Sequence, residues 1–186
     1  MIFLGHLGIT LLFVFAVFYF LKEDVDYRFV LVGAVLPDLL DKPIGDYLFY
    51  SVFQNGRIFG HTLLFVFTLT MLGSYVTRKY KAGFVELLAL GSLLHIAEDQ
   101  VWMVQGTLFW PLLGLEFPRY YLEDYAGYIL YVLTHNPDAY VPEIIGICIL
   151  AAFAIYFKLY RYERLRAFLA DGRLTSKARE KIVATG

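Results

Sequence analysis

The chain has 186 residues, of which 59% are hydrophobic and 18% aromatic, and its formal net charge is -1. Soluble domains contain about 45–50% apolar residues, so this composition and a mean hydropathy of +0.60 exclude an ordinary soluble domain and predict a membrane protein. The single cysteine, Cys148, excludes an intrachain disulfide, and no glycine-rich phosphate loop or other feature indicates nucleic-acid binding.

Apolar runs that are long enough to cross a bilayer, which takes about 20 mostly apolar residues, recur along the chain. The first has neither a basic start nor a small-residue cleavage site, so we expect a retained span and not a signal peptide. In the second, Pro37 and Pro43 predict a broken helix. The runs cover 1–21, 29–38 with a resumption over 47–53, 58–76, 84–104 and 141–157. They predict an all-α integral membrane bundle of about five helices, one of them broken near Pro37, in a single domain over 1–160.

The distribution of Lys and Arg predicts how this bundle is oriented, because cytoplasmic loops of membrane proteins are enriched in these residues. Two basic residues lie in the turn 22–28, three in the turn 78–81 and eight from Lys158 onward. The opposite segments hold fewer, with two over 41–57 and only Arg119 over 105–140. We therefore expect the protein in the cell membrane with its N-terminus outside and a basic cytoplasmic tail over 161–186.

Two segments outside the predicted spans are expected to lie at the membrane surface. The tail is predicted to continue the last span as an amphipathic basic helix, to break near Asp171-Gly172, and to be attracted to anionic headgroups. The outer segment 105–140 is rich in Tyr and Trp, which favour the headgroup region. An interfacial helix over 119–133 is predicted there, and it could equally cover a site as a lid.

Seven ionisable residues lie within or next to the predicted spans, where an ionisable group costs about 2.5–3.5 kcal/mol at the bilayer centre. The predicted topology places all of them toward the outer side. Each has an ordinary explanation: a lone histidine is more often bonded to a backbone carbonyl than to a metal, and a lone aspartate is usually a helix cap. Asp38 with Lys42, or Asp41 with Arg57, could be simple ion pairs. The seven residues are His6, Asp38, Asp41, His61, His95, Glu98 and Asp99.

Their convergence at one membrane depth favours a metal site over these separate explanations. His95 and Asp99 are four residues apart and share one face of a helix, so both could coordinate the same ion. Three histidines and three aspartates supply mixed nitrogen and oxygen ligands, which suit Zn²⁺, or Mn²⁺ or Fe²⁺ where oxygen dominates. The predicted ligands of one or two divalent ions are His6, Asp38, Asp41, His61, His95 and Asp99, with Glu98 as an orienting group and His135 as a loop residue.

The same residues recur in an ordered set of short motifs. These are GHLGIT with His6, GAVLPDLLDKP with Asp38 and Asp41, GRIFGHTLLF with His61, LLHIAEDQVW with His95 and Asp99, and LFWP at 108–111. Over roughly its first 115 residues the chain resembles the family of membrane-bound metal-dependent hydrolases known as YdjM-like inner-membrane proteins. That family is distantly similar to zinc-dependent phospholipase C, an all-helical enzyme.

The resemblance to phospholipase C implies a first metal site formed by Asp38 or Asp41 with His61, His95 and Asp99. It implies a second site formed by His6, the other carboxylate and Asp99 as a bridge. The further histidine-rich site of that enzyme has no firm match here, because only His135 and Glu143 are available. This departure favours two ions over three.

Two divalent ions about 3.5–4 Å apart activate a water and clamp the attacking and leaving oxygens, which suits phosphoester hydrolysis. In this scheme Asp41 orients or deprotonates the water, and Arg57 pairs with a substrate phosphate, unless Arg57 only anchors the chain at the headgroups. A site near the outer leaflet favours a phospholipid or another amphipathic phosphoester, so membrane lipids are the expected partners. Acyl or amide hydrolysis by one metal is the nearest rival reaction.

Two other classes of function fit the same residues. In a metal or proton transporter they would form an ion pathway, but the inner halves of the predicted spans are mostly apolar and offer no exit. In a non-catalytic membrane protein the metal would be structural, with every coordination position occupied by protein. Metal analysis combined with a screen of phosphoester substrates separates the three classes.

Overall fold

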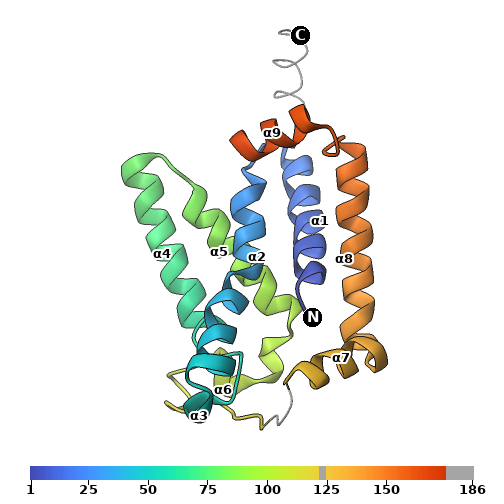
Figure 1. Ribbon diagram of the computed structural model, residues 1–186. Coiled ribbons are helices and arrows are strands. Elements are labelled where there is room, and N and C mark those ends of the chain that lie inside the picture. Colours follow the sequence, from blue (N-terminus) through green and yellow to red (C-terminus); the bar gives the residue numbers. More distant parts are fainter. Residues whose placement is uncertain (122–124, 175–186) are drawn as a thin grey trace.

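The computed structural model describes residues 1–121 and 125–174. Every regular element in these residues is a helix, which confirms the all-α class for this part of the chain (Figure 1). The longer helices are α1 (Leu4–Leu21), α2 (Tyr27–Lys42), α4 (Leu63–Tyr80), α5 (Phe84–Glu98), α7 (Tyr125–His135), α8 (Pro137–Tyr156) and α9 (Tyr162–Asp171). The short ones are the π-helix η1 (Pro43–Leu48), α3 (Tyr50–Phe53), the 3-10 helix η2 (Val101–Met103) and α6 (Gln105–Leu108).

The long helices form a bundle in which α4 packs on α5, α5 on α2, α2 on α1 and α1 on α8 (Figure 1). α9 lies across one end of this bundle, whereas α3, α6 and α7 lie at the opposite end. A core of apolar side chains, which includes Leu11, Val14, Tyr27, Val30 and Phe153, fills the half near α9. The buried polar side chains described below gather in the other half.

Two helices of the described residues, α1 and α8, are long and apolar enough to cross a membrane. The runs 58–76 and 84–104 correspond to the helices α4 and α5, with shifted ends. α2 and α5 have 16 and 15 residues, fewer than the roughly 20 that a membrane span takes, and α4 ends in Arg78 and Lys79. Helix length and composition therefore do not confirm a bundle of five spans.

The break predicted near Pro37 is wrong, because α2 continues through Pro37 to its end at Lys42. Proline has no N–H group, so the carbonyl four residues earlier, that of Gly33, loses its helical donor. Ser92 on α5 supplies the missing hydrogen bond from its hydroxyl group, at 3.2 Å. The helix changes only at Pro43, the first residue of η1. All of the residues from Tyr27 to Lys42 consequently lie on one continuous helix.

α2 and α5 pack closely because each contributes a glycine to their contact. A Cβ atom at Gly33 would clash with the backbone of Leu88, and one at Gly91 would clash with the backbone of Val30. The two backbones therefore approach each other, and polar side chains of α5 reach carbonyl groups of α2. This contact sets the position of the carboxylates on α2 relative to the polar end of α5.

α9 is a separate helix and does not continue the last predicted span, contrary to expectation. Five residues separate it from the end of α8, and the predicted break at Gly172 is found, with a positive φ of 73°. Arg28 holds the end of α9 by donating to the carbonyl groups of Leu169 and Ala170 at 2.6 and 2.9 Å. These bonds keep α9 across the bundle end (Figure 1).

The interfacial helix predicted over 119–133 corresponds to α7, which begins at Tyr125 and ends at His135. Residues 122–124, which belong to that prediction, lie outside the described residues. The part of the predicted basic tail beyond Leu174 also lies outside them.

Candidate metal centre

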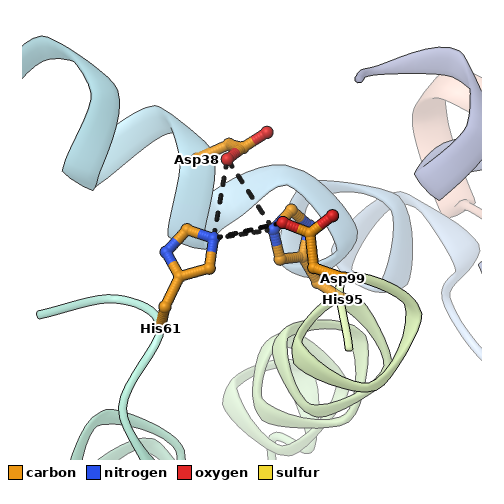
Figure 2. Close-up of side chains that lie close together, drawn as sticks. All are labelled: Asp38, His61, His95 and Asp99. Carbon is orange, nitrogen blue, oxygen red and sulfur yellow. Dashed lines mark hydrogen bonds and ion pairs between the residues drawn. The ribbon is translucent and has the colours of Figure 1, made fainter. Parts of the chain in front are cut away.

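Four side chains from α2, from α5 and from the loop before α4 converge in the half of the bundle away from α9 (Figure 2). They are Asp38, His61, His95 and Asp99, called here the four-residue cluster, and one ligand atom of each lies within 4.8 Å of the others. His61 Nε2 and His95 Nε2 are 3.2 Å apart, and Asp38 Oδ1 lies 3.6 and 3.8 Å from them. Asp99 Oδ2 lies 3.8 Å from His61 Nε2.

The hydrogen bonds of the two histidines fix where their protons lie. His61 Nδ1 is 2.7 Å from Asp41 Oδ2, and His95 Nδ1 is 2.7 Å from the carbonyl oxygen of Ala34. Because both partners are acceptors, each Nδ1 carries a proton and donates, and an Nε2 without a proton of its own presents a lone pair. Two lone pairs that face each other at 3.2 Å become favourable when a cation lies between them.

The oxygen atoms of the cluster fit the same position. Asp38 Oδ1 is buried and has no hydrogen-bond partner among the described residues, which is uncommon for a buried polar atom. Donor atoms about 2.1 Å from a tetrahedral zinc ion lie about 3.4 Å apart. Four of the distances between donor atoms, 3.2 to 3.8 Å, bracket that value, and all of them lie within 4.8 Å. The donor set of the cluster therefore fits a divalent metal ion.

Asp41 is buried beside the cluster and is not one of its members. Its carboxylate accepts four hydrogen bonds, from the backbone N–H groups of Ile58, Gly60 and His61 at 2.7, 2.8 and 3.2 Å and from His61 Nδ1 at 2.7 Å. The loop before α4 thus wraps around this carboxylate, which brings His61 toward α2. A carboxylate in this position orients the ring of a metal-binding histidine and raises its basicity.

His6 on α1 also lies outside the cluster and packs against it. Its Nδ1 is 2.8 Å from Glu98 Oε2, and Thr10 donates to the other oxygen of Glu98 at 2.9 Å. The His6 ring stacks on His95 with a centroid distance of 3.9 Å, and its Nε2 lies 3.3 Å from Asp99 Oδ1. Glu98 therefore holds His6 against the two cluster members that come from the end of α5.

Two cationic side chains contact the carboxylates of the cluster. Lys42 Nζ donates to Asp38 Oδ2 at 2.5 Å, and a terminal nitrogen of Arg57 forms an ion pair with Asp99 Oδ2 at 2.7 Å. Of the two ion pairs considered from the sequence, that of Asp38 with Lys42 is present, whereas Arg57 pairs with Asp99 in place of Asp41. Both cationic side chains are partly exposed, but the carboxylates that they contact are buried.

Glu143 on α8 holds the start of α1, a role that the sequence pattern did not indicate. Its carboxylate accepts hydrogen bonds from the N–H groups of Ile2, Leu4 and Gly5 at 2.7, 2.8 and 3.1 Å. The N–H groups at a helix start have no partner within the helix, so this carboxylate supplies one. The available signal was an ionisable residue at the start of an apolar run. By fixing the first turn of α1, Glu143 also positions His6.

His135 is the last residue of α7 and does not join the cluster. Its ring is exposed and stacks on that of Tyr131 with a centroid distance of 4.7 Å. Of the four histidines in the chain, two thus belong to the cluster and His6 packs against it.

A cavity of about 640 Å³ lies beside Asp99. It is bounded by the start of α1, the end of α5 and the start of α8, and its lining includes Ile9, Glu98, Asp99, Val141 and Pro142. Carboxylates and apolar side chains therefore share its wall. Ligand pockets of proteins have volumes of about 300–1,000 Å³, so Asp99, the one member of the cluster in this lining, borders a space large enough for a small molecule.

A family model described as YdjM inner membrane protein matches residues 1–165. No curated protein and no solved structure gives a match. The matched range contains the whole four-residue cluster and every residue described here as contacting it. Because the match covers most of its length, the chain belongs to the YdjM inner membrane protein family.

Proposed function

We propose that this protein is a membrane-embedded, metal-dependent hydrolase that acts on a phosphoester of a lipid or another amphipathic molecule at the outer leaflet. The observation that carries the proposal is the pair of facing Nε2 atoms on His61 and His95, with the unpartnered oxygen of Asp38 beside them. Membership of an inner membrane protein family supports a location in the membrane. The cavity beside Asp99 supports access of a substrate to the cluster.

The metal ion would be held by Asp38, His61, His95 and Asp99. Two nitrogen and two oxygen donors suit Zn²⁺ first, with Mn²⁺ and Fe²⁺ as alternatives. A bound divalent ion would supply a Lewis acid and a water of lowered pKa, which are the requirements of phosphoester hydrolysis. The distant similarity to zinc-dependent phospholipase C, inferred from the motifs alone, belongs to the same proposal.

The side chains around the cluster orient it and supply charge. We assign Asp41 the orientation of His61, in place of the ligand and base roles expected from the sequence, because its carboxylate already accepts four hydrogen bonds. We assign His6 the positioning of Asp99 and His95, in place of a ligand role. Arg57 keeps the role of binding a substrate phosphate, because it is partly exposed next to Asp99.

We further propose that α2, α4 and α5 lie in the membrane with α1 and α8, which gives five spans over 1–160 with an outer segment over 105–140. Large exposed apolar side chains on α4 support this arrangement, since such surfaces in a membrane protein face lipid. They are Leu63, Leu64, Phe67, Met71 and Leu72. The segments at the α9 end, with α9 itself and Arg173 included, carry ten of the 16 Lys and Arg residues (Figure 1), which favours that end, with the tail over 161–186, in the cytoplasm.

A structural metal site in a non-catalytic membrane protein is the second candidate, and one observation favours it. Four protein donors complete a tetrahedral shell around zinc, whereas catalytic zinc sites usually keep one position for water. The third class, a metal or proton transporter, finds less support, because the apolar core around Val14 and Val30 separates the cluster from the α9 end.

Metal content and turnover, measured on the same purified protein in detergent, separate these functions. A hydrolase should contain about one metal ion per chain, hydrolyse at least one phosphoester in a panel of lipid and soluble compounds, and lose both properties in Asp99→Ala. His135→Ala, which removes an exposed histidine, should retain both. Metal without turnover on any compound would favour the structural site, and metal-driven proton or ion flux in vesicles would favour a transporter. A protein without metal would overturn the proposal.

A further inference from the structure

We propose that Lys42 and Arg57 together bind the terminal phosphate group of a phosphate monoester beside the metal position. This inference rests on the proposed metal site and deepens it by naming the substrate class. The two side chains come from different elements, the end of α2 and the loop before α4, and each contacts a different carboxylate of the four-residue cluster. They therefore flank the cluster on its two carboxylate ligands.

Both cationic groups keep donors that a ligand would use. The Lys42 ammonium has three N–H groups, and Asp38 Oδ2 is its only polar partner among residues 1–121 and 125–174. The Arg57 guanidinium has five N–H groups, and its ion pair with Asp99 Oδ2 engages one terminal nitrogen. The two side chains are 33% and 42% exposed, so their remaining donors are accessible from outside the buried cluster.

The charges of the site explain why the ligand is an anion. Lys42 forms an ion pair with Asp38, and Asp99 forms two, with Arg57 at Oδ2 and with the N-terminal ammonium of Met1 at Oδ1, at 2.7 and 2.9 Å. A divalent ion held by the same two carboxylates would share their negative charge, and the two cationic side chains would then lack a full counter-charge in a partly buried site, where charge interactions are strong. An anion that contacts both side chains restores the balance, and charge-assisted hydrogen bonds to phosphate are strong.

A phosphate monoester matches this arrangement better than a diester does. Its phosphate group carries a charge of about −1.5 to −2 at pH 7 and presents three acceptor oxygens. Three oxygens suffice for one contact each to Lys42, to Arg57 and toward the cluster. A diester has a single negative charge and two free oxygens, so one of these three contacts would be lost.

Binding of phosphate compounds to the zinc-loaded protein tests this inference without a need for turnover. Inorganic phosphate, glycerol phosphate and a short-chain phosphatidic acid are titrated in detergent, with a short-chain phosphatidylglycerol as the diester. We expect Lys42→Met and Arg57→Met each to weaken binding of the monoesters by about 10–100-fold, the size expected for a lost hydrogen bond to a charged group. Lys42→Arg should retain most of the affinity. Lys22→Met should retain all of it, because Lys22 follows the C-terminal end of α1, away from His6 and the cluster.

Zinc affinity, measured in the same variants, keeps the two proposals distinguishable. Lys42→Met should bind zinc at least as tightly as the unchanged chain, because Asp38 loses a competing cation. Monoester binding that is unchanged in Lys42→Met, or a diester that binds as tightly as a monoester, would overturn this inference and leave the metal site standing. A chain that binds no zinc would overturn the proposed function and this inference with it. Tighter binding of phosphatidic acid than of glycerol phosphate would identify a lipid as the source of the phosphate, and equal binding would identify a soluble monoester.

Discussion

The Nε2 atoms of His61 and His95 face each other at 3.2 Å, each on the side of its ring away from the hydrogen-bonded Nδ1. The cause lies on the far side of each ring, where Asp41 accepts the Nδ1–H of His61 and the carbonyl group of Ala34 accepts that of His95. Two helices and one loop thus present two lone pairs to one point. Such an arrangement is favourable when a cation occupies that point.

Replacement of His6 by alanine should weaken metal binding and not abolish it, because His6 lies outside the cluster and packs against His95 and Asp99. About one zinc ion per chain is expected in the unchanged protein and in His6→Ala, whereas His95→Ala should contain none. Mass spectrometry of the dialysed proteins gives these ratios, with His135→Ala as the control. A ratio of two that falls to one in His6→Ala would show instead that His6 holds a second ion.

Asp41→Asn should weaken zinc binding by about 10–100-fold, the usual effect of changing a residue that orients a metal ligand. The amide keeps the size of the carboxylate but supplies less negative charge to the ring of His61. Competition with a chelator of known affinity measures the change, and Asp138→Asn on an exposed turn of α8 is the matched control. Loss of zinc as complete as in His61→Ala would identify Asp41 as a direct ligand.

Ser92→Ala should lower the free energy of unfolding by about 1–3 kcal/mol, because the buried carbonyl group of Gly33 loses the hydrogen bond that Ser92 donates to it. The cost should shrink in a Pro37→Ala background, where an alanine N–H group restores the helical hydrogen bond to Gly33. Thermal unfolding in one detergent, measured for both single variants and the double variant, gives the coupling between the two positions. Equal costs of Ser92→Ala in both backgrounds would contradict this account of how α2 passes through Pro37.

Glu143→Gln should also lower the free energy of unfolding by about 1–3 kcal/mol, because hydrogen bonds from the first N–H groups of α1 to a charged acceptor are replaced by weaker ones. The melting temperature measures this loss. Glu86→Gln, an exposed position in the first turn of α5, is the control and should change it little. Equal melting temperatures for the two variants would show that Glu143 does not hold α1.

Labelling of single cysteines from outside the cell tests the proposed orientation. In a Cys148→Ser background, Leu113→Cys, at an exposed position near the candidate metal centre end, should react with a membrane-impermeant maleimide in intact cells. Arg166→Cys on α9 should react only after the membrane is permeabilised, because the basic end is expected in the cytoplasm. The opposite labelling pattern would reverse the proposed orientation.

The apolar runs of the sequence were sufficient to predict an all-helical membrane protein, because hydrophobicity over that length is a local property of the chain. They also made the candidate ligands recognisable in the sequence, because an ionisable group inside a membrane-spanning run costs free energy and so needs a reason to be there. Four of the six predicted ligands do meet in one cluster. From the sequence Asp38 was the favoured direct ligand, whereas Asp41 stayed open as a second ligand or as the base beside the water, because the two carboxylates lie only three residues apart.

Only the tertiary structure shows how the surroundings of the two carboxylates differ. The N–H groups of the loop that carries His61 donate to the carboxylate of Asp41. Asp38 Oδ1, in contrast, has no hydrogen-bond donor in the described part of the chain and lies near the two histidines. The passage of α2 through Pro37 likewise depends on Ser92, a residue of another helix. In each case the role of a side chain is set by its partner, and partners that are distant along the chain are brought together only by packing of the helices.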